Sequence, residues 1–158
     1  MKRSLKTGLS FGLTSGITTT LGLIVGLNSG THSKLVVIGG ILTIAIADAA
    51  SDALGIHISE ESKTTNTTRE IWEATISTFL SKVIFTLSFV VPVLLFELEP
   101  AIIISIIWGM LLIGIFSFYV AKTEHSNPTE VVIEHLAIMI FVIIATNYVG
   151  SWVSATFG

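Results

Sequence analysis

The sequence predicts an all-helical integral membrane protein with five membrane-spanning helices, on three observations. Hydrophobic residues make up 51% of its 158 residues and charged residues only 12%, whereas a soluble domain is about 25% charged. The mean hydropathy is +0.85. The apolar residues fall into about five stretches of roughly 20 residues, the length with which one helix crosses a bilayer. The whole chain is therefore expected to form a single transmembrane domain.

The boundaries of the five helices follow from the polar segments between the apolar stretches. The basic start of the chain and the apolar run behind it resemble a signal peptide, but no Ala-x-Ala-like cleavage site follows Leu27. We therefore expect a retained first helix. Short connections predict antiparallel neighbours. The expected spans are residues 8–28, 35–58, 71–96, 101–121 and 131–154.

The basic residues predict the orientation of the chain. If the N-terminus is cytoplasmic, Lys34 is the only basic residue on the outside, and Lys82 lies on the inner side about two turns into the third span. Inner loops of membrane proteins carry an excess of Lys and Arg. We therefore expect a cytoplasmic N-terminus and a C-terminus outside. The other residues on the inner side are Lys2, Arg3, Lys6, Lys63, Arg69 and Lys122.

Composition and motifs exclude several classes of function. The chain has no cysteine, which excludes disulfides, iron-sulfur clusters and thiolate metal sites. Its net charge of -3 gives no electrostatic basis for binding nucleic acid. No nucleophile, zinc-protease or phosphate-loop motif is present. Asp48 and Asp52 match half of the CDP-alcohol phosphotransferase motif, but the preceding segment of that motif is absent, so we expect no enzyme activity.

The first span carries glycines at a spacing of four, which permits close approach of another backbone. The approach is either packing within the chain, a homodimer contact, or a pore-lining face. Hydroxyl side chains lie between the glycines. Most such hydroxyls bond to their own helix backbone, but Ser15 and Thr19 share a face and are candidates for a polar path. The glycines are Gly8, Gly12 and Gly16, then Gly22, Gly26 and Gly30.

Two aspartates in the second span are the most informative residues. At 1.5 Å per residue from Ile58, Asp52 lies roughly 9 Å deep and Asp48 roughly 15 Å deep, with Ser51 between them as a candidate pore-lining residue. A carboxylate inside a membrane costs roughly 2.5 to 3.5 kcal/mol and indicates function. A spacing of four puts both on one helix face, where two negative charges repel by roughly 2 to 3 kcal/mol.

With no intramembrane arginine to neutralise Asp48 and Asp52, the empty pair is expected to hold at least one proton. A divalent cation would displace that proton, and oxygen ligands favour Mn²⁺ or Fe²⁺ over Cu⁺. Ser15 is expected level with Asp52, and Thr19 level with Asp48, so the first span can complete the ligand shell. The alternative is that both aspartates stay protonated and only donate hydrogen bonds between helices.

At these two spans the chain resembles the vacuolar iron transporter family of five-helix Fe²⁺ and Mn²⁺ transporters. GLTSGITTT at residues 12–20 and GLNSG at 26–30 are similar to the family's Asp-Gly-Leu-Thr-Thr and Ala-Gly-Leu-Ser-Gly segments. ADAASDALGIHIS at 47–59 is similar to Ala-x-Ala-x-Ser-Met-Ala-x-Gly-Glu-Tyr-Leu-Ser. The resemblance implies a homodimer with a metal path between the paired first helices and metal transport in exchange for protons.

The chain departs from the family pattern at the expected site. Ser15 stands where the family has its pore aspartate, and Asp52 stands where it has a methionine, so the acidic ligand has moved to the second span. The family's large cytosolic metal-binding domain is missing. Glutamates on the inner side are candidates for a reduced cation-collecting vestibule, or form an ordinary solvated face. They are Glu60, Glu61, Glu70, Glu73, Glu130 and Glu134.

These observations predict a divalent metal ion transporter that exchanges Fe²⁺ or Mn²⁺ for protons at Asp48 and Asp52. The metal is the transported substrate, and no cofactor is expected. The expected partners are the lipid bilayer and a second copy, bound through the glycine-rich first span. The membrane would be the cell membrane in a prokaryote. Two alternatives remain open: a membrane scaffold that transports nothing, and an exchanger of another cation such as Na⁺ for protons.

Overall fold

The structure, a computed structural model, describes residues 2–158, and all its regular secondary structure is helical. Five segments are long and apolar enough to cross a membrane, with α3 and α4 together forming one of them. The predicted all-helical class is therefore confirmed, and the number of helical segments with the length and composition of a membrane span agrees with the five expected. The helices are α1 (Arg3–Thr31), α2 (Lys34–Glu61), α3 (Thr68–Ser88), α4 (Val90–Leu95), α5 (Leu98–Thr123) and α6 (Pro128–Phe157).

Helices α2, α3 and α6 begin before their expected spans, at polar residues whose side chains cap them. Ser33 accepts a hydrogen bond from the backbone N–H of Val36 at the start of α2. Thr67 and Glu70 form a reciprocal capping box at the start of α3. Asn127 caps α6, which opens with Pro128. Hydropathy marks the apolar core of a span, whereas the caps set where its helix begins.

The third span is interrupted, which the hydropathy pattern did not predict. Residues 71–96 were expected as one helix, but α3 ends at Ser88 and α4 begins at Val90. Pro92 is the physical cause, because proline has no N–H to donate to the carbonyl of Ser88 and its ring clashes with that carbonyl. The N–H of Phe89 bonds to the carbonyl of Thr86 in a tightened last turn.

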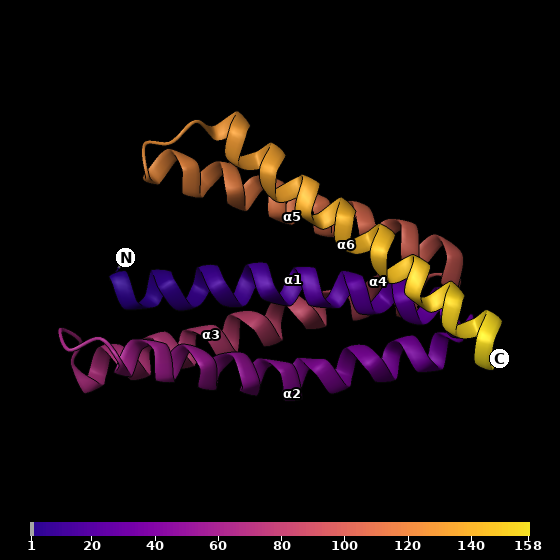
Figure 1. The fold of residues 1–158 in the computed structure, drawn as a ribbon, viewed down its shortest axis with the longest axis horizontal. Coiled ribbons are helices and arrows are strands. Elements are labelled where there is room, and N and C mark those ends of the chain that lie inside the picture. The colour runs from indigo at the N-terminus through magenta and orange to yellow at the C-terminus, as the bar shows by residue number, and fades with distance from the viewer. Residues whose placement is uncertain (1) are drawn as a thin grey trace.

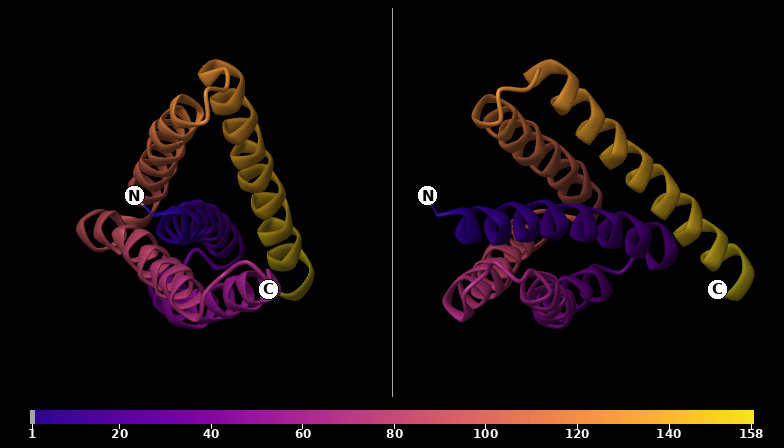
Figure 2. Two further views of the ribbon diagram at one scale, coloured as in Figure 1. Left: turned by 90° about the vertical axis from the view of Figure 1, so that its left-hand side faces the viewer. Right: turned by 60° about the vertical axis from the view of Figure 1, so that its left-hand side comes forward.

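Helix α1 runs through the middle of the bundle (Figure 1). It contacts α2, α3, α5 and α6. Helices α2 and α3 lie on one side of α1, while α5 and α6 form a hairpin on the other (Figures 1 and 2). The hairpin diverges from α1 toward the end of the bundle that holds the N-terminus. We call this end, where α1, α3 and α6 begin, the N-terminal end.

Both glycine faces of α1 are occupied within the chain. Gly8, Gly12 and Gly16 lie against α3, and a side chain at Gly12 would collide with the Thr78 carbonyl. The second face lies against Thr146 and Gly150 of α6, through Gly22, Gly26 and Gly30. The close packing predicted for α1 is therefore present, and its partners are α3 and α6. A homodimer through the same glycines would have to displace one of these helices, and dimerisation stays a prediction.

The surface around this core is apolar. In α6 only Met139 and Gly150 are buried, and its outer face presents large side chains such as Phe141 and Tyr148. Hydrophobic surfaces of this extent are absent from monomeric soluble proteins. The exposed apolar faces therefore fit helices that contact lipid, in agreement with an integral membrane protein.

Candidate functional site

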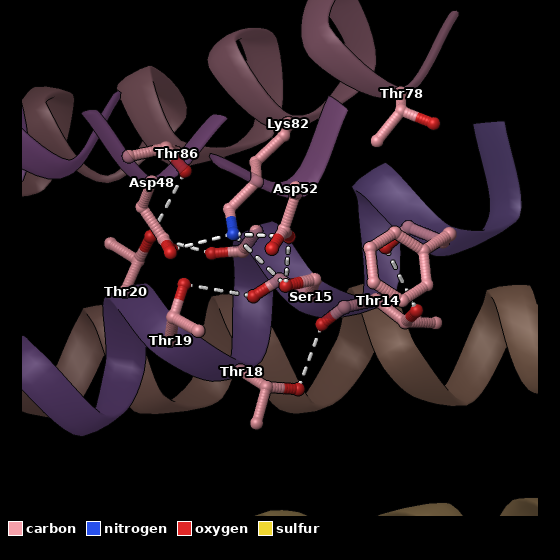
Figure 3. A network of polar contacts seen from close by, with 12 residues as sticks. Thr14, Ser15, Thr18, Thr19, Thr20, Asp48, Asp52, Thr78, Lys82 and Thr86 are labelled. Atoms are coloured by element: carbon pink, nitrogen blue, oxygen red, sulfur yellow. Dashed lines mark hydrogen bonds and ion pairs between the residues drawn. The ribbon is translucent and has the colours of Figure 1, made fainter. Parts of the chain in front are cut away.

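The helical spacing of Asp48 and Asp52 turns both side chains from α2 toward α1 and α3 (Figure 3). Ala45, Ala49 and Ala53, on the same stripe of α2, are buried. Their small side chains let the three helices approach closely. The Asp52 side chain is 19% exposed and the Asp48 side chain 32% exposed. The two acids therefore stand at a junction of three helices, with one edge open.

Lys82 of α3 lies between the two acids, and its side chain is completely buried. Its Nζ is 2.5 Å from Oδ2 of Asp48 and donates a hydrogen bond to Oδ2 of Asp52. The same ammonium contacts Oγ of Ser15 at 3.0 Å. Ser15 in turn donates to Asp52 Oδ2 at 2.6 Å. We call these four residues, Ser15, Asp48, Asp52 and Lys82, the Asp-Lys cluster.

This arrangement corrects the expectation of an unneutralised acid pair. The sequence contains no arginine in the second or third span, but Lys82 supplies the cation instead. Its positive charge lies against both carboxylates and offsets the repulsion expected between them. Lys82 was also expected among the basic residues of the inner side. Its side chain is instead fully buried against α1 and α2.

The cluster as a whole has one more acid than base. With both carboxylates ionised and Lys82 charged, its net charge is negative by one. Asp48 is the less satisfied of the two acids, because its Oδ2 atom is buried and accepts no hydrogen bond within residues 2–158. Its contact with Lys82 is an ion pair by distance without hydrogen-bond geometry. Asp48 thus has Lys82 as its one polar partner among residues 2–158, whereas Asp52 also accepts a hydrogen bond from Ser15.

The three predicted pore-lining residues have different environments. Ser15 joins the Asp-Lys cluster, as its predicted depth beside Asp52 requires. Thr19 instead donates its hydroxyl to the Ser15 carbonyl at 2.9 Å, within its own helix. Ser51 is exposed on α2. Of these three residues, only Ser15 contacts an aspartate, namely Asp52, within the described chain.

A second polar pair lies beside the cluster. The hydroxyls of Thr20 and Thr86 are 3.1 Å apart, and both side chains are fully buried. Figure 3 shows this pair next to Asp48. Thr86 follows Lys82 by one turn of α3, so both lie on the face that meets α1. The polar part of the interface thus continues beyond the cluster toward the other end of the bundle.

The predicted vestibule glutamates are not gathered into one site. Glu60 binds Lys63 and Asn66 in the connection after α2. Glu73 binds Lys2, Ser4 and Arg69, and Glu70 caps α3. Glu61, Glu130 and Glu134 are exposed. Over residues 2–158, no three His, Asp or Glu side chains are grouped as a metal site would need.

A separate cavity of about 520 Å³ lies between α1, α5 and α6. Its lining is mainly apolar and includes Phe11, Phe116 and Met139, with His135 at one wall. His135 Nδ1 is 2.7 Å from the Ser117 hydroxyl. None of the four residues of the Asp-Lys cluster lines this cavity. The ionisable site and this cavity between α1 and the α5–α6 hairpin are therefore distinct features.

Comparisons with known proteins add no identification. No protein-family model and no curated protein sequence matches the chain. The function of the protein is therefore inferred from the geometry and chemistry of the Asp-Lys cluster.

Proposed function

We propose that the protein is a membrane transporter that exchanges a cation for protons at Asp48 and Asp52. The observation that carries the proposal is the surplus of acids over bases in the Asp-Lys cluster: two aspartates converge on one lysine at the junction of three apolar helices. Ionisable side chains in membrane segments are costly and typically mark ion pathways.

The unbalanced charge explains why the site would exchange ions. In a medium of low dielectric, an uncompensated carboxylate binds either a proton or a cation. Because both neutralise the same oxygens, binding of one favours release of the other. Asp48, whose one polar partner among the described residues is Lys82, is the acid at which we expect this competition to be strongest.

The donor atoms favour a hard cation. Asp48, Asp52 and Ser15 offer carboxylate and hydroxyl oxygens, which suit Mn²⁺ and Fe²⁺ better than Cu⁺. The resemblance of the first two spans to vacuolar iron transporters supports the same substrate class. We therefore propose a divalent metal ion as the transported cation, with Na⁺ as the competing candidate that the experiment must separate from it.

The test is uptake of Mn²⁺ and Fe²⁺ into proteoliposomes that contain a trapped pH dye. The native chain should couple metal entry to proton exit, and Asp48→Asn or Asp52→Asn should abolish both signals. Glu61→Gln is the matched control, because Glu61 is an exposed acid outside the cluster. Inhibition by Na⁺, with Na⁺ driving proton movement alone, would assign the site to Na⁺ instead.

A membrane scaffold that transports nothing is the second candidate. It is favoured by one observation, namely that Lys82 contacts both acids and so ties α3 to α2. In this case the folded Asp48→Asn and Asp52→Asn variants would behave like the native protein in every flux assay. Absence of flux under all gradients, with the native protein shown to be folded, would exclude the transporter proposal.

A further inference from the structure

We propose that Lys82 is a tethered cation that occupies the transport site in the empty protein, and that an incoming metal ion must displace its ammonium. This inference deepens the proposed function and depends on it for its physiological meaning. It assigns Lys82 a role as a built-in competitor that closes the site.

The Lys82 ammonium lies among oxygen atoms of the three other residues of the cluster. Lys82 Nζ contacts Oδ2 of Asp48 at 2.5 Å and Oγ of Ser15 at 3.0 Å, and it also bonds to Asp52. These are the same oxygens that would coordinate a metal ion. A lysine ammonium is a compact point charge that carries three donors and no acceptor. Its position between the three oxygens is therefore the position that a bound cation would take.

The Lys82 ammonium and a divalent metal ion differ in charge. The ammonium brings one positive charge to a site with two carboxylates, whereas a divalent ion brings two and neutralises both. A divalent cation thus gains more from the site than Lys82 does. Because the ammonium and a metal ion carry like charges, the divalent ion gains this advantage fully only after Lys82 has moved away from the two carboxylates.

The aliphatic stem of Lys82 packs against Gly16 of α1. A Cβ atom at Gly16 would lie 3.3 Å from Cγ of Lys82, so the stem rests on a helix surface without a side chain. The lysine is anchored on α3 while its ligands are on α1 and α2 (Figure 3). Displacement of the ammonium would therefore loosen contacts among three helices, which links occupancy of the site to the packing of the bundle.

The experiment measures Mn²⁺ binding to detergent-solubilised protein by electron paramagnetic resonance. Lys82→Met should bind Mn²⁺ at least about tenfold more tightly than the native chain, because the competing cation is gone. Adding Asp48→Asn and Asp52→Asn to that variant should remove the gain. Lys122→Met is the matched control, since Lys122 is an exposed lysine near the end of α5, and its affinity should equal that of the native chain.

Equal affinities of the native chain and folded Lys82→Met would overturn the inference. If Lys82→Met does not fold, Lys82→Gln carries the same test with a neutral side chain that can still donate to Asp52. If neither folds, the native protein is labelled with an amine-reactive reagent and analysed by mass spectrometry. Saturating Mn²⁺ should then raise labelling of Lys82, and unchanged labelling would exclude displacement.

The displacement of Lys82 and the transport function can be rejected independently of each other. Tighter binding by Lys82→Met together with no flux in native proteoliposomes would retain the tethered cation and reject the transporter. Proton-coupled flux in the native protein, without a gain of affinity in folded Lys82→Met, would retain the transporter and reject the tethered cation.

Discussion

Gly16 of α1 lies directly against the backbone of Lys82: a Cβ atom at Gly16 would be 3.2 Å from the Lys82 carbonyl oxygen. The glycine face of α1 thus sets how closely α3 approaches, and so where the Lys82 ammonium meets the acids of α2. The packing of two apolar helices and the geometry of the ionisable site are consequently parts of one arrangement.

Substitution of this glycine face should destabilise the bundle. In Gly12→Ala the new methyl group would collide with Ser81 and with the Thr78 backbone, and overpacking of this kind costs about 1–3 kcal/mol. We expect a lower midpoint of thermal unfolding in detergent, followed by circular dichroism. Gly39→Ala is the control, because nothing lies within 4 Å of a Cβ atom there. Equal midpoints for the two variants would contradict the packing described.

Ser15 and Thr19 should respond differently to loss of their hydroxyls. Ser15→Ala removes the donor to Asp52 and the acceptor for Lys82, so we expect weaker metal-driven proton flux, by about tenfold for a loss of roughly 1.5 kcal/mol. Thr19→Val should leave flux unchanged, because the Thr19 hydroxyl bonds only to its own helix. The measurement is the proteoliposome assay. A larger effect of Thr19→Val than of Ser15→Ala would contradict the assignment of Ser15 to the site.

The number of apolar segments long enough to cross a membrane was predictable from the sequence, because hydropathy is high in every one of them. The interruption before Pro92 was not predicted. Proline removes a helix hydrogen bond, but a hydropathy count over an apolar stretch does not register that loss. The exact helix ends depend on caps such as Thr67, which act through side-chain hydrogen bonds.

The candidate site was predictable in part. The contact between Ser15 and Asp52 was predictable, because the helix rise alone places the two residues at similar depths on antiparallel helices. The role of Lys82 was missed, although a lysine inside an apolar stretch is itself a signal of function. Its pairing with α2 depends on how α3 rotates against α1, and that rotation is set by the glycine contacts rather than by local sequence.

Lysine and arginine residues predict the orientation of the bundle in the membrane. Because the connections after α2 and α5 belong to the basic N-terminal end, we expect both to be cytoplasmic. The chain has no cysteine, so single cysteines can be labelled with a membrane-impermeant maleimide. Thr64→Cys and Ser126→Cys should react only after permeabilisation of cells, whereas His32→Cys should react in intact cells. The reverse pattern would place the N-terminus outside and contradict the predicted orientation.

An ion pair at the N-terminal end should make stability depend on pH. Lys6 of α1 binds Glu124 after α5, and this hydrogen bond lowers the pKa of Glu124 below its usual 4.5. A carboxyl with a lowered pKa in the folded state stabilises above its unfolded pKa, and the effect is lost as pH falls through the folded pKa. The native chain should therefore lose this contribution on acidification below about pH 4.5.

The measurement is the unfolding midpoint of native, Glu124→Gln and Lys6→Met proteins in detergent across this range of pH. Each variant should lack the same small component of the native pH dependence, and the double variant should lack no more than either alone. Because both side chains are partly exposed to solvent, the effect should be small and should fade at about 0.5 M salt. A native-like pH profile in Glu124→Gln would show that this ion pair does not join α1 to α5 in solution.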